Sequence, residues 1–278
     1  MYSSLNPGAI GIDCTFKEGL SLAARHGFAG YHFKLEEVAD LGSERAVDLA
    51  AAEGVRLAAW GFPTEFRKDE ATFKKDLAEL EKLAKVAAQL GVLRTATWIM
   101  PFSDTLDFQE NFDLHASRLR QAAEVLAEHG IHLGLEYVGP KTMWSSGRYP
   151  FIHTMDEMLE LCEAVGPNAG LLLDCFHWYT AHETADDLRR LSPEQIVDVH
   201  VNDVPDKPVD EQIDNIRDLP GATGVIDVTT FLVTVKEAGY DGPVMVEPFS
   251  ERVRQLSADE ACAETAASLK RVLQQAGA

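Results

Sequence analysis

The chain has 278 residues, 46% of them hydrophobic, which is enough for a sizeable core. Its 45 acidic and 25 basic residues give a net charge of −20, which would repel phosphate backbones, so we expect no nucleic-acid partner. There is no CxxC pair, no apolar run of about 18 residues and no basic segment typical of a signal peptide, so we expect a cytoplasmic protein without disulfides or membrane contact.

Strand-like runs alternate with helical stretches along the chain. The first run is at residues 9–13, and others lie near residues 30, 56, 93, 132, 170, 197 and 244. Six of the helical stretches are followed by a glycine and then directly by the next run, at Gly27, Gly54, Gly91, Gly130, Gly166 and Gly239. Because glycine readily adopts the left-handed conformation that ends a helix, this pattern indicates a repeated αβ unit.

Eight such units predict a (β/α)8 TIM barrel, since the chain is only slightly longer than the ~250 residues typical of that fold. We expect one domain over residues 1–278. A doubly wound sheet is the alternative, but no GxGxxG follows the first run and no P-loop sequence is present. The irregular stretch at residues 202–225 is too long for an idle loop.

Four consecutive strands are predicted to end in a possible metal ligand. These residues are Glu136, Asp174, His200 and Glu247. A single acid at a strand end is usually a solvated residue or a helix cap, but three converging carboxylates would raise one another's pKa unless a cation were present. The sequence therefore predicts a divalent metal site at the carboxyl end of the barrel, where TIM-barrel active sites lie. Such ligands suit Mn²⁺, Mg²⁺ or Co²⁺, and Zn²⁺ is also compatible.

The segments GLEY, LLLDCFHW, VDVHVND and VMVEPF resemble the xylose isomerase-like superfamily, which includes ketose 3-epimerases and inosose isomerases and dehydratases. The resemblance implies one divalent ion, with Mn²⁺ favoured, bound by the four residues above. It also implies that His177 and Arg217 contact substrate oxygens. Arg217 precedes a Pro-Gly element that departs from the family at residues 221–224, where Gly-Ala-Thr-Gly replaces the common Gly-Glu-Gly.

The resulting hypothesis is an isomerase or epimerase of a keto-sugar or related polyol. Glu136 and Glu247 would act as the catalytic acid–base pair, by proton abstraction through a metal-bound cis-enediolate. Trp60 and Trp98 follow the third and fourth strands and would offer flat walls to a sugar or cyclitol. The alternative for each tryptophan is packing within the loops or at a subunit interface, and a homo-oligomer is compatible with the sequence.

Three other functions remain open at this point. A lyase could use the same metal site, either as a keto-inositol dehydratase or as an enzyme that cleaves 3-keto-glycosides. A non-catalytic sugar-binding barrel is less favoured. An endonuclease IV-like enzyme would need further histidines, and none follows His200. Asp198 is expected to be a polar strand residue or a neighbour within the barrel. Asp203 could hold a partner loop or support His200. No Ser-His-Asp triad is recognisable.

Overall fold

Eight parallel strands close into a barrel in the order β1-β10-β9-β8-β6-β4-β3-β2, which confirms the predicted TIM barrel. The computed structural model describes the backbone of residues 1–278 and all side chains except those of Ala39 and Asp40. The barrel strands are β1 (Tyr2–Leu5), β2 (Gly30–Phe33), β3 (Arg56–Gly61), β4 (Arg94–Trp98), β6 (His132–Glu136), β8 (Ala169–Asp174), β9 (Ile196–Val201) and β10 (Pro243–Val246). A small antiparallel sheet pairs β5 (Phe102–Ser103) with β7 (Tyr149–Pro150).

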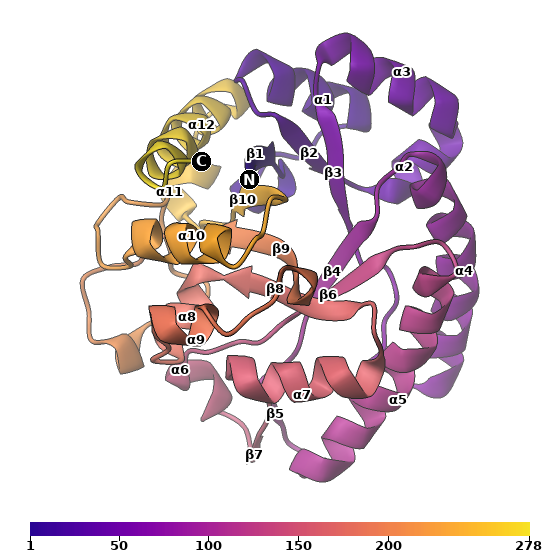
Figure 1. The fold of residues 1–278 in the computed structure, drawn as a ribbon, viewed down its shortest axis with the longest axis vertical. Coiled ribbons are helices and arrows are strands. Elements are labelled where there is room, and N and C mark those ends of the chain that lie inside the picture. The colour runs from indigo at the N-terminus through magenta and orange to yellow at the C-terminus, as the bar shows by residue number, and fades with distance from the viewer.

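Helices surround the barrel, and α12 packs beside β1 so that both ends of the chain lie together (Figure 1). The longer helices are α1 (Phe16–Arg25), α2 (Leu35–Leu41), α3 (Ser43–Glu53), α4 (Glu70–Gln89), α5 (Phe108–Ala127), α7 (Met155–Val165), α10 (Val228–Glu237) and α12 (Ala258–Gln275). Short ones are η1 (Gly8–Ile10), α6 (Lys141–Trp144), α8 (Cys175–Thr180), α9 (Ala185–Leu188), η2 (Pro193–Gln195), η3 (Val209–Glu211) and α11 (Glu251–Arg254). Over the described part of the chain, none of these helices has both the length and the apolar character needed to cross a membrane.

The glycines that follow the helices behave as predicted at five of six positions. Their φ values lie between 68° and 96° at Gly27, Gly54, Gly91, Gly130 and Gly239. Gly166 differs, because its φ of 151° and ψ of 173° give a more extended backbone after α7. The five left-handed residues let each helix stop and the chain turn directly into the next strand.

The first strand is not where the sequence pattern placed it. Residues 9–13 form the end of a 3-10 turn and a loop, and the barrel strand is β1, which pairs with both β10 and β2. Ile10 is buried as part of the turn and therefore resembled a strand residue. The pattern missed β1 because Ser4, a polar residue, is buried there and contacts His32.

Candidate metal centre

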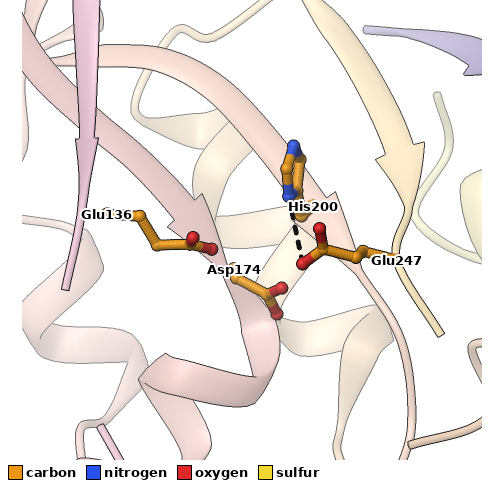
Figure 2. A group of neighbouring side chains, drawn as sticks. All are labelled: Glu136, Asp174, His200 and Glu247. Atoms are coloured by element: carbon orange, nitrogen blue, oxygen red, sulfur yellow. Dashed lines mark ion pairs between the residues drawn. The ribbon is translucent and has the colours of Figure 1, made fainter. Parts of the chain in front are cut away.

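The four predicted ligands meet at the carboxyl end of the barrel (Figure 2). Glu136 ends β6, Asp174 ends β8, His200 lies near the end of β9, and Glu247 follows β10. The strand register aligns them, since Asp174 pairs with His200 and the Glu247 amide donates to a β9 carbonyl, that of Val201. Each side chain offers one ligand atom, and these atoms lie within 4.8 Å of one another.

Two buried polar atoms in this group lack a hydrogen-bond partner. They are Glu136 Oε1 and His200 Nδ1. Buried polar atoms are costly unless they are paired, so each requires a partner at the centre of the cluster. Three carboxylates and one imidazole around one point are the donors that a divalent cation binds. The residues therefore fit a single divalent ion.

The electrostatics of the cluster show how strongly its charges interact. Burial, together with the negative charges of Glu247 and Asp174, raises the pKa of Glu136 well above its usual range. Burial alone would lower the pKa of His200, but its interaction with Glu247, 3.8 Å away, raises it to about 10. Without a metal ion, then, protons balance part of the negative charge, and a dication can take over that role.

Asp174 is fully buried and is held by several donors. Its Oδ1 accepts from the backbone N–H of Phe176 at 2.7 Å and from Asn202 Nδ2 at 2.9 Å. Its Oδ2 accepts from Arg217 Nη1 at 2.8 Å. The guanidinium of Arg217 lies between the rings of Phe176 and Phe249, 4.2 and 4.8 Å from their centroids. These contacts fix both Asp174 and Arg217 in place.

His177 lies beside the cluster in a defined protonation state. Burial and the positive charge of Arg217 lower its pKa to about 3, so the ring is neutral. Its Nδ1 accepts from the Gly139 backbone N–H at 3.2 Å, which leaves the ring proton on Nε2. That nitrogen lies 3.4 Å from Arg217 Nη2, 3.7 Å from Glu136 Oε1 and 3.8 Å from Asp214 Oδ1. Because Arg217 can only donate, the two carboxylate oxygens are the acceptors near the Nε2 proton. His177 therefore presents an N–H donor to the site.

A cavity of about 730 Å³ opens beside the candidate ligands. His200 and Glu247 form part of its wall, and the indole of Trp60 forms another part. Trp98 is 37% exposed and stacks with Arg67, whose guanidinium carbon is 4.9 Å from the ring centroid. The structure thus places Trp60 at the cavity and Trp98 in a more exposed stack.

The sequence analysis did not identify Asn202, Gly139 or Asp214 as site residues. Asn202 could have been found from its spacing, because it follows His200 by two residues and so lies on the same side of the chain. Gly139 and Asp214 lie in loops and left no pattern in the sequence. Asp203 holds a loop, as suggested, since its carboxylate accepts from the backbone N–H groups of Val204, Thr223, Gly224 and Ile226.

Comparisons with known proteins identify the family and support the fold. The family model described as xylose isomerase-like TIM barrel matches residues 20–272. An inosose isomerase of Halalkalibacterium halodurans is 30% identical over 195 residues, which is 70% of this chain and 66% of the relative, slightly under two thirds of its length. A xylose isomerase domain protein from Alicyclobacillus acidocaldarius has a TM-score of 0.90 at 30% identity, covering all of both chains. An IolI protein with a bound zinc atom has a TM-score of 0.83 at 21% identity, covering 99% of both chains.

Proposed function

The chain belongs to the xylose isomerase-like TIM barrel family, and from this premise we propose that it is a divalent-metal-dependent isomerase or epimerase of a keto-sugar or keto-cyclitol. The observation that carries the proposal is the convergence of four ligand atoms, two of them buried without a partner, beside a cavity large enough for a small molecule. The similarity to an inosose isomerase supports a cyclitol as substrate.

Glu136, Asp174, His200 and Glu247 would together hold one divalent ion. Mn²⁺ is our preferred metal, because oxygen-rich ligation with one imidazole suits it. The structurally similar IolI protein has a bound zinc atom, so a protein of this fold can hold a divalent ion. When bound, the ion would act as a Lewis acid that makes a C–H next to a carbonyl more acidic.

Glu136 and Glu247 would remove and return the proton. They come from β6 and β10 and so approach the centre from different sides (Figure 2). Return to the opposite face of the same carbon gives epimerisation, and return to the neighbouring carbon gives isomerisation. His177 would donate a hydrogen bond from its Nε2–H group to one substrate oxygen. Arg217 would bind a second substrate oxygen. Trp60 would contact an apolar face of the substrate from the cavity wall, whereas Trp98, in its exposed stack with Arg67, lies outside the residues that line this cavity.

Solvent deuterium exchange with an inosose as probe tests this function. In D₂O, the metal-loaded protein should place deuterium on the carbon next to the carbonyl. Glu136→Gln and Glu247→Gln keep a side-chain oxygen but cannot take the proton, so each should lower turnover about 10²–10⁴-fold. The control is Glu124→Gln, an exposed glutamate on α5. Product without deuterium, together with near-normal rates in both glutamine variants, would refute proton transfer by this pair.

The same experiment distinguishes the lyase alternative. A dehydratase also begins by removing the proton next to the carbonyl, but then loses an oxygen leaving group. Mass spectrometry of the product would show the loss of water from a lyase reaction and an unchanged mass, apart from deuterium, from an isomerase or epimerase.

A further inference from the structure

A buried chain of hydrogen bonds links three strands of the barrel. Ser4 Oγ on β1 lies 2.8 Å from His32 Nδ1 on β2, and His32 Nε2 lies 2.8 Å from Asp198 Oδ2 on β9. The three residues are 1%, 7% and 2% exposed. Such a set of polar groups inside a barrel is stable only if its members satisfy one another, as they do here.

The contacts of this hydrogen-bond chain resemble those of a Ser-His-Asp triad, since Ser4 and Asp198 each engage one ring nitrogen of His32. It differs from a nucleophilic triad in that the Ser4 hydroxyl is buried away from the cavity. Of the three side chains, His32 and Asp198 line the cavity, and Ser4 lies farther inside. Ser4 therefore has no path to a substrate carbon. Among these three residues, Asp198 is the hydrogen-bond acceptor at the cavity.

Asp198 has hydrogen-bonding capacity left over. Its Oδ2 accepts from His32, and its Oδ1 accepts from the Val199 backbone N–H at 2.9 Å. A carboxylate has about four acceptor positions, so two remain. Asp198 precedes His200 by two residues on β9, which places it about 6.6 Å farther down the strand. A six-carbon substrate that reaches His200 could extend a hydroxyl to Asp198.

A second polar group of the same cavity also lacks a partner. The indole N–H of Trp60 is buried without a hydrogen bond, and Trp60 lines the cavity. A hydroxyl both donates and accepts, so a polyol could satisfy both the Asp198 carboxylate and this N–H. The cavity wall therefore includes two residues with unused hydrogen-bonding capacity, Asp198 and Trp60, besides the candidate metal ligands.

The charges of the cavity wall disfavour an anionic ligand. Besides Asp198, its acidic residues include Asp13, Glu36 and Glu37. Lys34 also lines it, but its ammonium lies 3.6 Å from Asp13. A carboxylate in this cavity would meet negative charge, and Lys34, the lysine among the described lining residues, is already paired with Asp13.

We propose that Asp198 is a substrate-binding residue that accepts a hydrogen bond from a hydroxyl remote from the reacting carbons, an inference that rests on the proposed function. His32, anchored by Ser4, is a positioning residue that holds the carboxylate. The site therefore selects an uncharged, hydroxylated substrate over one that is deoxygenated or carboxylated at that position.

The experiment compares an inosose with deoxy-inososes that each lack one hydroxyl. A hydrogen bond to a charged group is worth about 10- to 100-fold, so one deoxy compound should show that loss in kcat/KM with the wild-type protein. In Asp198→Asn, the difference between this compound and the inosose should fall to within about threefold, with metal content unchanged. His32→Gln should reduce the difference too. Asp241→Asn, at an exposed acid preceding β10, is the matched control and should preserve it.

Three results would overturn the proposal. The first is a wild-type protein that tolerates every deoxy compound outside the reacting carbons. The second is an Asp198→Asn variant that weakens both compounds equally, because that indicates a structural role. The third, which is independent of whether the variants fold, is a crystal structure of the wild type with bound inosose in which no hydroxyl oxygen lies within hydrogen-bond distance of Asp198.

Binding measurements keep this proposal separate from the proposed function. The affinity of each compound for the metal-loaded protein is measured by quenching of tryptophan fluorescence, which requires no turnover. Discrimination in binding without deuterium exchange would support the role of Asp198 and refute the isomerase. Exchange without discrimination would support the isomerase and refute the role of Asp198.

Discussion

Gly139→Ala should disturb His177 while leaving the candidate metal ligands in place. A Cβ atom at position 139 would lie 2.5 Å from the carbonyl oxygen of His177, 2.8 Å from Thr180 Oγ1 and 3.0 Å from the Ala181 nitrogen. Two of these atoms belong to the backbone of α8 and its end. Rotating a flexible side chain therefore cannot relieve the contact, and the loop has to move away from the helix.

The size of the effect follows from two contributions. Overpacking of a tight contact costs about 1–3 kcal/mol. Movement of the loop also breaks the 3.2 Å hydrogen bond from the Gly139 N–H to His177 Nδ1, worth about 0.5–1.5 kcal/mol. We therefore expect a loss of about 2–4 kcal/mol in the free energy of unfolding. Because that bond keeps the proton on Nε2, kcat/KM should fall by about tenfold or more.

Urea denaturation, metal analysis and kcat/KM for an inosose measure the three quantities. Gly54→Ala is a useful control, because nothing lies near its Cβ but its φ of 68° makes an alanine strained. It should lower stability by about 1 kcal/mol without changing kcat/KM or metal content. A Gly139→Ala protein with wild-type stability and activity would show that the close packing around His177 is unimportant.

Three further predictions concern other parts of the molecule. Burial lowers the pKa of His115 from 6.5 to about 4, so the unfolded chain binds a proton at a higher pH than the folded protein does, and roughly 3 kcal/mol of stability should be lost as the pH falls from 6.5 to 4. In His115→Asn, which retains a donor for the Asn111 carbonyl, the urea midpoint should vary less over this range. An equal pH dependence of the two proteins would contradict the argument. Metal analysis should find one divalent ion per chain, and EDTA should lower Tm; two or more ions in the pocket would exclude a mononuclear site. Asp203→Asn loses a charged acceptor for the backbone N–H groups of Thr223 and Gly224, so the free energy of unfolding should fall by about 1–3 kcal/mol. Proteolysis at residues 219–226 should increase, and an unchanged cleavage pattern would count against this role.

The sequence predicted the position of the candidate ligands because their signals are local. A buried apolar strand such as β8 ends abruptly in Asp174, and parallel strands bring such ends to the same side of a barrel. The order of polar residues along the chain was therefore enough to predict that the four side chains meet. It could not predict how each is held, because Arg217 lies 43 residues from Asp174 and reaches it only through a folded loop.

The first strand shows the opposite case. Its inward residue, Ser4, is buried against His32, which in turn contacts Asp198. His32 lies 28 positions from Ser4 in the sequence, and Asp198 lies 166 positions from His32. A polar strand inside a barrel has no apolar alternation, so a periodicity search passes over it. The same contacts that hid β1 from the sequence analysis build the polar wall of the cavity. A departure from the usual pattern of burial can therefore mark functional residues.

The hydrogen bonds of the cluster also restrict which carboxylate can act as a base. Both oxygens of Asp174 already accept from Asn202, and each has another donor, Phe176 for Oδ1 and Arg217 for Oδ2. These four contacts fill the roughly four acceptor positions of the carboxylate, so an ion would have to take the place of one of these donors and no position is left for a proton. Glu136 keeps one oxygen without any partner. Asp174 is thus suited to be a fixed ligand, and a carboxylate that both contacts the ion and takes a proton has to come from a glutamate such as Glu136.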